Sequence, residues 1–365
     1  MNKNTKNIIQ YTFLISLIIL TIYSLRTTLD MSILPHILKI INIKYILFGV
    51  LFIILYMIFE ILVFKIMLKS LNIKQKKLDI KLAMMGFYYN LVTPFASGSQ
   101  PMQIYLLTKN RVSISKSTAL ITNKTVVFQS VVTIYTIATV FLNKDLLNKE
   151  VSAVTLFIMA GLCMNVVTIV SGLLIVLNPK KVKVLSNKII ASLNKIKFIN
   201  LKSNNINKFI DEYNRSIVGF IKHKNDLVKS IILTIIQITI YFSISYCIYK
   251  AFDLNKVSYI TLLVLQNFLY MSVSPIPTPG NVGANEIAFI SIFSNVFPKE
   301  FIGYAVFLYA ILVYYIILLI SGVFTIKTHY ELNKKSNKQE SNHKSKGINQ
   351  VWFIPFLIVS KIFKK

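Results

Sequence analysis

The fold of this chain is decided by two stretches of its sequence, MGFYYNLVTPFASGSQPMQIYLL at residues 85–107 and LQNFLYMSVSPIPTPGNVGANEIAFISIF at residues 265–293. Both stretches are apolar, but proline and glycine residues interrupt each of them near its middle. Proline removes a backbone donor and clashes with the preceding helical turn, so neither stretch suits one continuous helix. We predict that each stretch forms two half-helices joined by a loop.

The loops between these half-helices need shelter from lipid. Backbone groups without a hydrogen-bond partner cost several kcal/mol each in hydrocarbon, so unwound backbone persists only inside protein or beside a wet cavity. We therefore predict that the two breaks meet near the bilayer midplane and form a polar interior. The N-termini of half-helices at such breaks can face an anionic group, and a phospholipid phosphate is one candidate.

The composition indicates an integral membrane protein. Of the 365 residues, 55% are hydrophobic and 15% are charged, with a mean hydropathy of +0.62, which is too apolar for an ordinary soluble protein. We predict an all-α polytopic membrane protein with two re-entrant segments and six full transmembrane helices. The predicted spans lie at about 8–25, 45–64, 118–142, 151–177, 227–249 and 301–326, the first being an uncleaved anchor.

The basic residues are sorted between the two sides of the predicted membrane. Loops on one side hold 31 Lys and Arg residues and loops on the other hold eight, provided that both broken segments return to the side from which they entered. The positive-inside rule then places both termini of this multi-pass cell membrane protein in the cytoplasm. The two breaks enter from opposite sides, which is the topology of an inverted repeat. Because the concentration of Lys and Arg on one side of the membrane explains the net charge of +28, we expect no nucleic-acid partner.

The chain is predicted to have one transmembrane domain and a tail. Residues 1–330 form the transmembrane domain, which includes a basic cytoplasmic loop at 178–226. Residues 331–365 form a basic cytoplasmic tail, in which VWFIPFLIVSKIFKK is too short to span and is expected to lie on the membrane surface. Two cysteines and four scattered histidines show no ligand-like spacing, so we expect no metal and no cofactor.

The chain resembles the lysylphosphatidylglycerol synthase transmembrane family, also called flippase-like, in two strings: TPFASGSQPMQIYLL at 93–107 and PTPGNVGANEIAF at 277–289. The resemblance covers nearly the whole chain. It implies that the protein translocates or handles an anionic or aminoacylated phospholipid through a polar site inside the membrane. Many relatives carry Glu and Arg where this chain has Gln100 and Gln103, so neutral hydrogen bonding would have to replace a charged grip on the headgroup.

The candidate lipid pathway combines the polar, proline and glycine positions of the two breaks with one lysine of the predicted span that follows the first break. These residues are Asn90, Thr93, Pro94, Ser97, Gly98, Gln100, Pro101, Gln103, Lys124, Pro277, Pro279, Gly280, Gly283, Asn285 and Glu286.

Four ionisable residues lie within or near the predicted membrane segments. Glu286 is either a functional carboxylate in the membrane or the cap of a half-helix. Lys124 either snorkels to the interface or acts inside the membrane, where it can pair with Glu286 or meet a phosphate. Glu60 and Lys65 are interpreted as boundary residues that water reaches.

Lipid translocation is the predicted function, and two alternatives stay open. Full-length lysylphosphatidylglycerol synthases resemble a fusion of this membrane region to a cytoplasmic domain that transfers lysine from tRNA. The soluble stretches of this chain are too short for such a catalytic core. The first alternative is nevertheless an enzyme, and the resemblance implies that it would be a phosphatidylglycerol lysyltransferase. Such an enzyme modifies membrane lipid, confers resistance to cationic peptides and requires tRNA. The second alternative is a membrane scaffold for a separate lipid-modifying enzyme. Expected partners are a membrane phospholipid and either a second copy of the chain or a partner enzyme.

Overall fold

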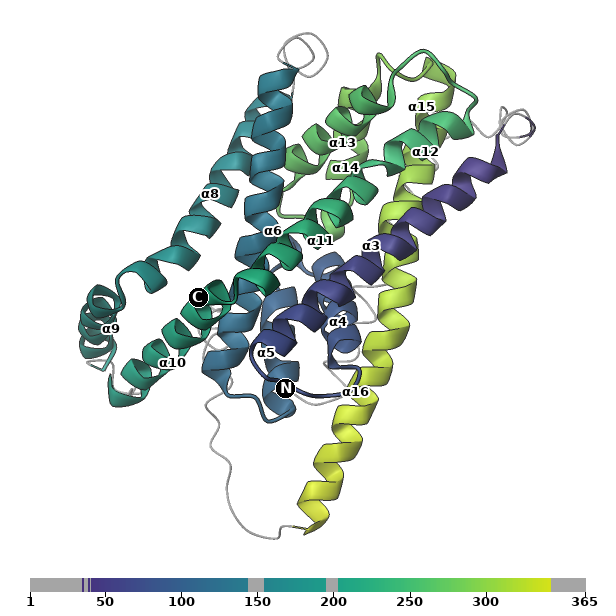
Figure 1. Cartoon of the computed structure of the whole chain (residues 1–365). Helices are drawn as coiled ribbons and strands as arrows, with labels where there is room; N and C mark the ends of the chain where they lie inside the picture. The colour runs from purple at the N-terminus through teal and green to yellow at the C-terminus, as the bar shows by residue number, and fades with distance from the viewer. Residues whose placement is uncertain (1–34, 36–38, 40, 144–153, 195–202, 343–365) are drawn as a thin grey trace, which may run out of the picture. The chain divides into compact units, whose positions relative to one another are not determined.

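The computed structural model describes residues 35, 39, 41–143, 154–194 and 203–342 (Figure 1). Within these ranges every regular element is a helix, which confirms the all-α prediction. The chain divides into two compact units, Met1–Thr325 and Ile326–Lys365. The second unit contains the C-terminal part of the helix α16 (Ile317–Asn342). The predicted surface segment at 351–365 lies outside the described residues.

Five helical runs are long and apolar enough to cross a bilayer, and they confirm five of the six predicted spans. The first three are α3 (Ile43–Ser70), α6 (Ile114–Leu142) and α8 (Thr155–Leu177). The fourth joins α11 (Lys224–Phe242) to α12 (Ile244–Ala251), and the fifth joins α15 (Lys299–Ala310) to α16 through the π-helix η4 (Ile311–Ile316). The predicted span at 8–25 lies outside the described residues.

The long helices pack closely while they keep apolar side chains on their outer surfaces. Along α3, Leu47 and Leu51 are exposed and Ile53 is buried. Because lipid tails are as apolar as leucine, helices in a bilayer associate through close van der Waals packing rather than through the hydrophobic effect. Gly49 illustrates this packing, since a Cβ atom there would lie 2.9 Å from Cδ1 of Leu312.

Both interrupted stretches form the predicted pairs of half-helices. The first hairpin consists of α4 (Leu78–Val92), the short 3-10 helix η1 (Pro94–Ala96) and α5 (Ser99–Lys109). The second consists of α13 (Tyr259–Val273), the 3-10 helix η3 (Pro279–Asn281) and α14 (Ala284–Phe293). The longest of these half-helices, with 15 residues, extends only about 22 Å, which is less than the hydrocarbon thickness of about 30 Å.

The two hairpins meet at their breaks. Within each hairpin the two half-helices pack on one another, so the chain turns back on itself. Figure 1 shows α4 and α5 in the lower half of the view and α13 and α14 in the upper half. The element η3 contacts both η1 and α4. The contact confirms that the breaks lie together, and their depth in a membrane stays a prediction.

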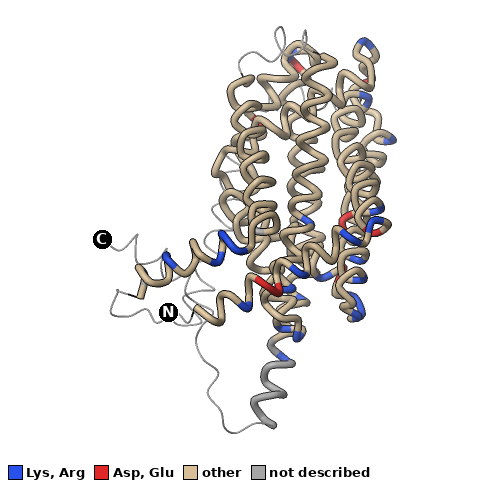
Figure 2. The backbone as a smooth tube through the Cα atoms, turned by 60° about the vertical axis from the view of Figure 1, so that its left-hand side comes forward, with Lys and Arg blue, Asp and Glu red and all other residues tan. Residues whose placement is uncertain are grey.

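The predicted basic loop at 178–226 is largely helical. It contains α9 (Pro179–Leu193) and α10 (Ser203–Lys222), and α10 packs along α6. Lys183 pairs with Asp211 at 2.6 Å, and Ser113 donates to a carboxylate oxygen of Glu212 at 2.7 Å. Figure 2 shows more Lys and Arg residues in the lower half of the view than in the upper half. This asymmetry supports the predicted sorting, while the assignment of that side to the cytoplasm stays a prediction.

Candidate functional site

The first break is held by a threonine hydroxyl. Thr93 donates through Oγ1 to the carbonyl of Tyr89 at 2.5 Å and accepts from the backbone N–H of Gly98 at 2.9 Å. Between these bonds, Phe95 and Ala96 have φ values of 53° and 54°. Left-handed backbone is costly for residues with a Cβ atom, so this loop is strained. The two hydrogen bonds of Thr93 hold it in this conformation.

The second break is held by a carboxylate and by glycine. Glu286 accepts the backbone N–H of Gly283 at 2.6 Å, which confirms the capping alternative for this residue. Gly280 and Gly283 have φ values of 59° and 83°, a conformation that glycine adopts without steric cost. A Cβ atom on Gly280 would also lie 2.8 Å from the carbonyl oxygen of Leu91 in α4 and would press against the ring of Tyr314.

Polar groups are buried without partners beside the second break. Among the described residues, the hydroxyls of Thr278 and Tyr314 are buried and have no hydrogen-bond partner. Tyr314, Glu286 and Gly280 border a hollow of about 10 Å³, which is room for about one water molecule. The contact between the breaks is therefore polar but closed to anything as large as a lipid headgroup.

The two glutamines of the first motif differ in their surroundings. Gln103 is 4% exposed and donates to the carbonyl of Leu82 at 2.9 Å, so it links the two half-helices of the first hairpin. Gln100 is exposed and donates to the hydroxyl of Thr125 in α6 at 3.3 Å. Gln103 is thus engaged within the protein, whereas Gln100 remains accessible at the edge of the break.

A buried ion pair joins three helices next to the first hairpin. Lys124 of α6 lies 2.5 Å from a carboxylate oxygen of Glu60 in α3, and Gln237 of α11 donates to the other oxygen at 3.0 Å. The ammonium group of Lys124 also lies 4.7 Å from the ring centroid of Phe128, a cation–π distance. The lysine side chain is 18% exposed, so part of it remains accessible.

This pair corrects the interpretation of Glu60 as a boundary residue. Glu60 is 5% exposed and lies among the helices, not at a wet edge. Lys124 consequently pairs with Glu60, whereas Glu286 caps its own half-helix. The sequence contains a signal for the burial of Glu60. Four apolar residues, ILVF at 61–64, follow it, so its charge lies within the apolar run and not at its end.

Further buried amides and hydroxyls connect α13 to its neighbours. Asn267 donates to the hydroxyl of Thr139 at 2.6 Å and accepts from that of Thr136 at 2.9 Å. Gln266 donates to the hydroxyl of Tyr309 at 2.9 Å. These contacts fix α13 against α6 and α15, and the sequence analysis did not single out any of these residues.

The remaining predicted site residues lie along the two breaks with different exposure. The exposed ones of the first break are Asn90, Pro94, Ser97 and Pro101. At the second break Pro277 is exposed, whereas Pro279 and Asn285 are partly buried, and Asn285 donates to the carbonyl of Gly280 at 3.4 Å. The structure thus brings the two break loops together, and it places Lys124 in the ion pair with Glu60.

The apolar helices and the paired, interrupted hairpins define a polytopic membrane protein with broken helices at its centre. The sequence model of the family described as lysylphosphatidylglycerol synthase TM region matches residues 8–321. The chain belongs to this family, as the two motif strings indicated. The search of curated proteins and the search of solved structures gave no match.

Proposed function

We propose that this protein moves a phospholipid headgroup, anionic or aminoacylated, across the bilayer where the two broken hairpins meet. The observation that carries the proposal is the contact between η1 and η3, which brings two unwound segments from distant parts of the sequence together. Unwound backbone supplies amide and carbonyl groups that a polar headgroup can bind in place of water. Paired breaks of this kind are where transporters hold their substrates.

The unpartnered hydroxyls of Thr278 and Tyr314 support a polar occupant at this contact. A buried polar group without a partner costs about 1–3 kcal/mol. A hydroxyl or phosphate oxygen of a headgroup would pair with these groups and recover that cost. The second break therefore offers more hydrogen-bonding capacity than the protein itself uses.

Lys124 supplies the positive charge for a phosphate. Its ammonium group is partly exposed and pairs with Glu60, next to Thr125 and hence next to the exposed Gln100. An entering phosphate competes with Glu60 for the lysine, so the buried carboxylate keeps the site neutral while it is empty. This exchange gives the headgroup a charged partner without leaving an unpaired cation in the membrane between transport events.

Transport requires the breaks to separate, because the hollow at the second break has room for only about one water molecule. Gly280 and Gly283 are the natural hinges, since their backbone tolerates positive φ. The strained Phe95 and Ala96 on the opposing loop favour release of the first break. Opening would connect the exposed first break with the polar groups of the second.

Reconstitution tests this proposal directly. The purified chain is placed in vesicles that contain phosphatidylglycerol or lysyl-phosphatidylglycerol with a fluorescent label. A quencher is added outside, and the fluorescence decrease that follows as inner-leaflet lipid reaches the outer leaflet is measured with time. Gly280→Ala adds a methyl group against the ring of Tyr314 and the carbonyl of Leu91. We expect translocation to slow at least tenfold, because alanine disfavours the positive φ of Gly280 and restricts the hinge on which separation of the breaks depends.

Gly219→Ala is the matched control, since a Cβ atom on Gly219 of α10 meets no atom of the described residues within 4 Å. This variant should translocate at the wild-type rate. If wild-type vesicles show no translocation above protein-free vesicles, or if Gly280→Ala and Gly219→Ala behave alike, the break contact is not the lipid route.

A further inference from the structure

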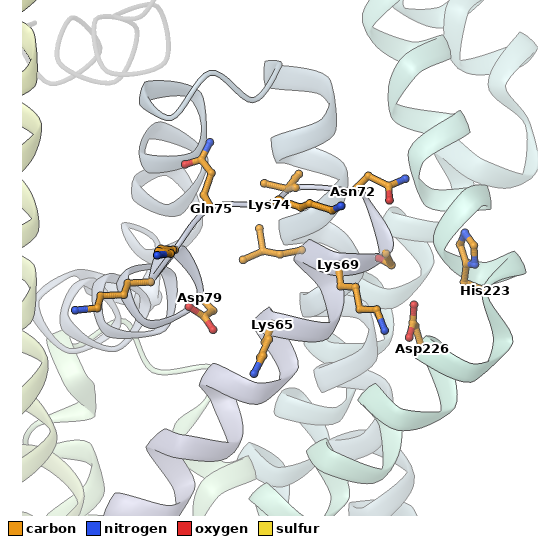
Figure 3. Close-up of a pocket in the computed structure, with 13 residues that line it drawn as sticks. Lys65, Lys69, Asn72, Lys74, Gln75, Asp79, His223 and Asp226 are labelled. Carbon is orange, nitrogen blue, oxygen red and sulfur yellow. The ribbon is translucent and has the colours of Figure 1, made fainter.

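A hollow of about 730 Å³ lies at the turn between α3 and α4, away from the broken hairpins' contact (Figure 3). Its basic residues are Lys65, Lys69, Lys74, Lys76 and Lys77, all of them exposed. Among the described residues that line it, the acidic ones are Asp79 and Asp226, and His223 is the remaining ionisable one. The five lysines outnumber the two aspartates, so the hollow carries a net positive charge, and its volume is that of an ordinary ligand pocket.

The loop that forms this hollow has a defined structure. Helix α3 ends in a Schellman motif, in which the N–H of Ile73 reaches the carbonyl of Leu68 at 2.9 Å and the N–H of Asn72 reaches that of Lys69 at 3.0 Å. Asn72 has a φ of 56°, as expected of the residue that follows such a helix end. Gln75 donates to the carbonyl of Asn110 at 2.5 Å and so ties the loop to the end of α5. The lysines are therefore presented from a fixed backbone.

The position of the hollow along α3 matches the depth of lipid headgroups. The stretch from Ile43 to Phe64 is long enough to cross the hydrocarbon core of about 30 Å, and the hollow begins directly after it at Lys65. Lys65 and Lys69 are one helical turn apart and share a face of α3. Figure 3 shows the Lys69 side chain directed toward the neighbourhood of Asp226. An anion bound here sits at the polar surface of the bilayer.

We propose that this lysine hollow binds the terminal phosphate of a membrane lipid, at a site separate from the translocation route. Lysine is a common phosphate ligand because its ammonium is a compact charge with three donors. A phosphate with one ester bond carries about −1.5 to −2 charge at neutral pH, whereas a phosphate with two ester bonds carries about −1. The excess of three lysines over aspartates therefore selects the headgroup with a terminal phosphate.

Binding to the full-length chain in detergent micelles tests the site. The probe is dioctanoyl phosphatidic acid, which has a terminal phosphate, titrated by isothermal calorimetry beside dioctanoyl phosphatidylglycerol. The triple variant Lys65→Gln, Lys69→Gln and Lys74→Gln should lower the affinity for phosphatidic acid at least tenfold. The control Lys180→Gln, Lys181→Gln and Lys188→Gln removes the same charge from exposed positions of α9 and should change the affinity less than twofold.

A second variant separates loss of binding from misfolding. Asp226→Asn removes a negative charge from the hollow and should tighten the binding of phosphatidic acid about threefold, which a damaged protein would not do. Equal losses in the two triple variants, or unchanged affinity in Asp226→Asn, would overturn the site. Phosphatidylglycerol binding as tightly as phosphatidic acid would overturn the preference for a terminal phosphate. Glycerol 3-phosphate binding as tightly as phosphatidic acid would overturn the lipid as the source of the phosphate.

Discussion

The two broken hairpins hold their unwound loops in place with different chemical groups. At the first break a neutral hydroxyl, from Thr93, holds a loop in which Phe95 and Ala96 carry the positive φ values. At the second break a carboxylate, from Glu286, holds a loop in which Gly280, Gly283 and Asn281 carry them, and these residue types adopt left-handed backbone more readily than Phe and Ala. The first loop is exposed and strained, and the second is more buried and relaxed. The difference indicates that the first hairpin is the more easily displaced of the two.

The helices that pack on the two hairpins also present different chemical groups. The first hairpin packs on α6, where Lys124 pairs with Glu60, so its surroundings are ionic. The second packs on α15 and lies beside η4, and there Tyr309 and Tyr314 present hydroxyl groups. A charge responds strongly to an entering anion, whereas a hydroxyl can donate to or accept from many groups. In the proposed lipid route, the ionic side would attract a headgroup and the tyrosine side would accommodate it.

Breaking the ion pair between Lys124 and Glu60, which distinguishes the surroundings of the first hairpin, should have the largest effect on the free energy of unfolding. Lys124→Leu leaves Glu60 buried without its cation, and we expect the free energy of unfolding to fall by about 3–5 kcal/mol. Steric-trapping measurements in bicelles give this quantity. The double variant Glu60→Leu, Lys124→Leu should recover most of the loss, because no lone charge remains. Additive losses in the double variant would show that the two residues do not form the functional pair described here.

Removing the Glu286 carboxylate that caps the second break should have an intermediate effect on the free energy of unfolding. Glu286→Ala leaves the N–H of Gly283 without its partner and should lower the free energy of unfolding by about 2 kcal/mol. Glu286→Gln keeps an acceptor and should cost less than about 1 kcal/mol. The matched change at the other break, Thr93→Val, removes a neutral and more exposed acceptor and should cost about 1 kcal/mol. If Thr93→Val costs more than Glu286→Ala, the ranking of the two breaks is reversed.

Relieving strain at the first break should have the smallest effect and the opposite sign. Ala96→Gly removes the Cβ penalty at a φ of 54°, and we expect a gain of less than about 1 kcal/mol in the free energy of unfolding, since glycine also loses more entropy on folding. Thermal unfolding in detergent micelles, compared with the wild type, detects such a gain. A lower midpoint for Ala96→Gly would mean that the strain relieved at this position is smaller than the extra entropy that glycine loses on folding.

The sequence was sufficient to predict the two hairpins because Pro and Gly act locally on the backbone. Residues such as Pro94, Pro279 and Gly280 mark the breaks without reference to any other part of the chain. Five spans were predictable for a similar reason, since the length of an apolar run depends on neighbouring residues alone. The helices within 178–226 were not predicted, because their basic residues drew attention to charge and away from amphipathic periodicity.

Pairings between distant helices could not be deduced in this way. Lys124 and Glu60 are 64 positions apart, and their contact depends on how α3 and α6 cross. Nothing in a list of candidate partners distinguishes Glu60 from Glu286 until the helices are placed. The closed contact between the breaks is likewise a property of packing, because it depends on the ring of Tyr314 filling the space beside Gly280.

The water-sized hollow beside Tyr314 bears on the electrical insulation of the membrane. A hydrated sodium or potassium ion is larger than a single water molecule, so a hollow that admits about one water does not conduct ions. With the loops closed, the proposed lipid route therefore gives hydrated sodium and potassium ions no passage at this point. Leakage would be confined to the brief intervals in which the loops part.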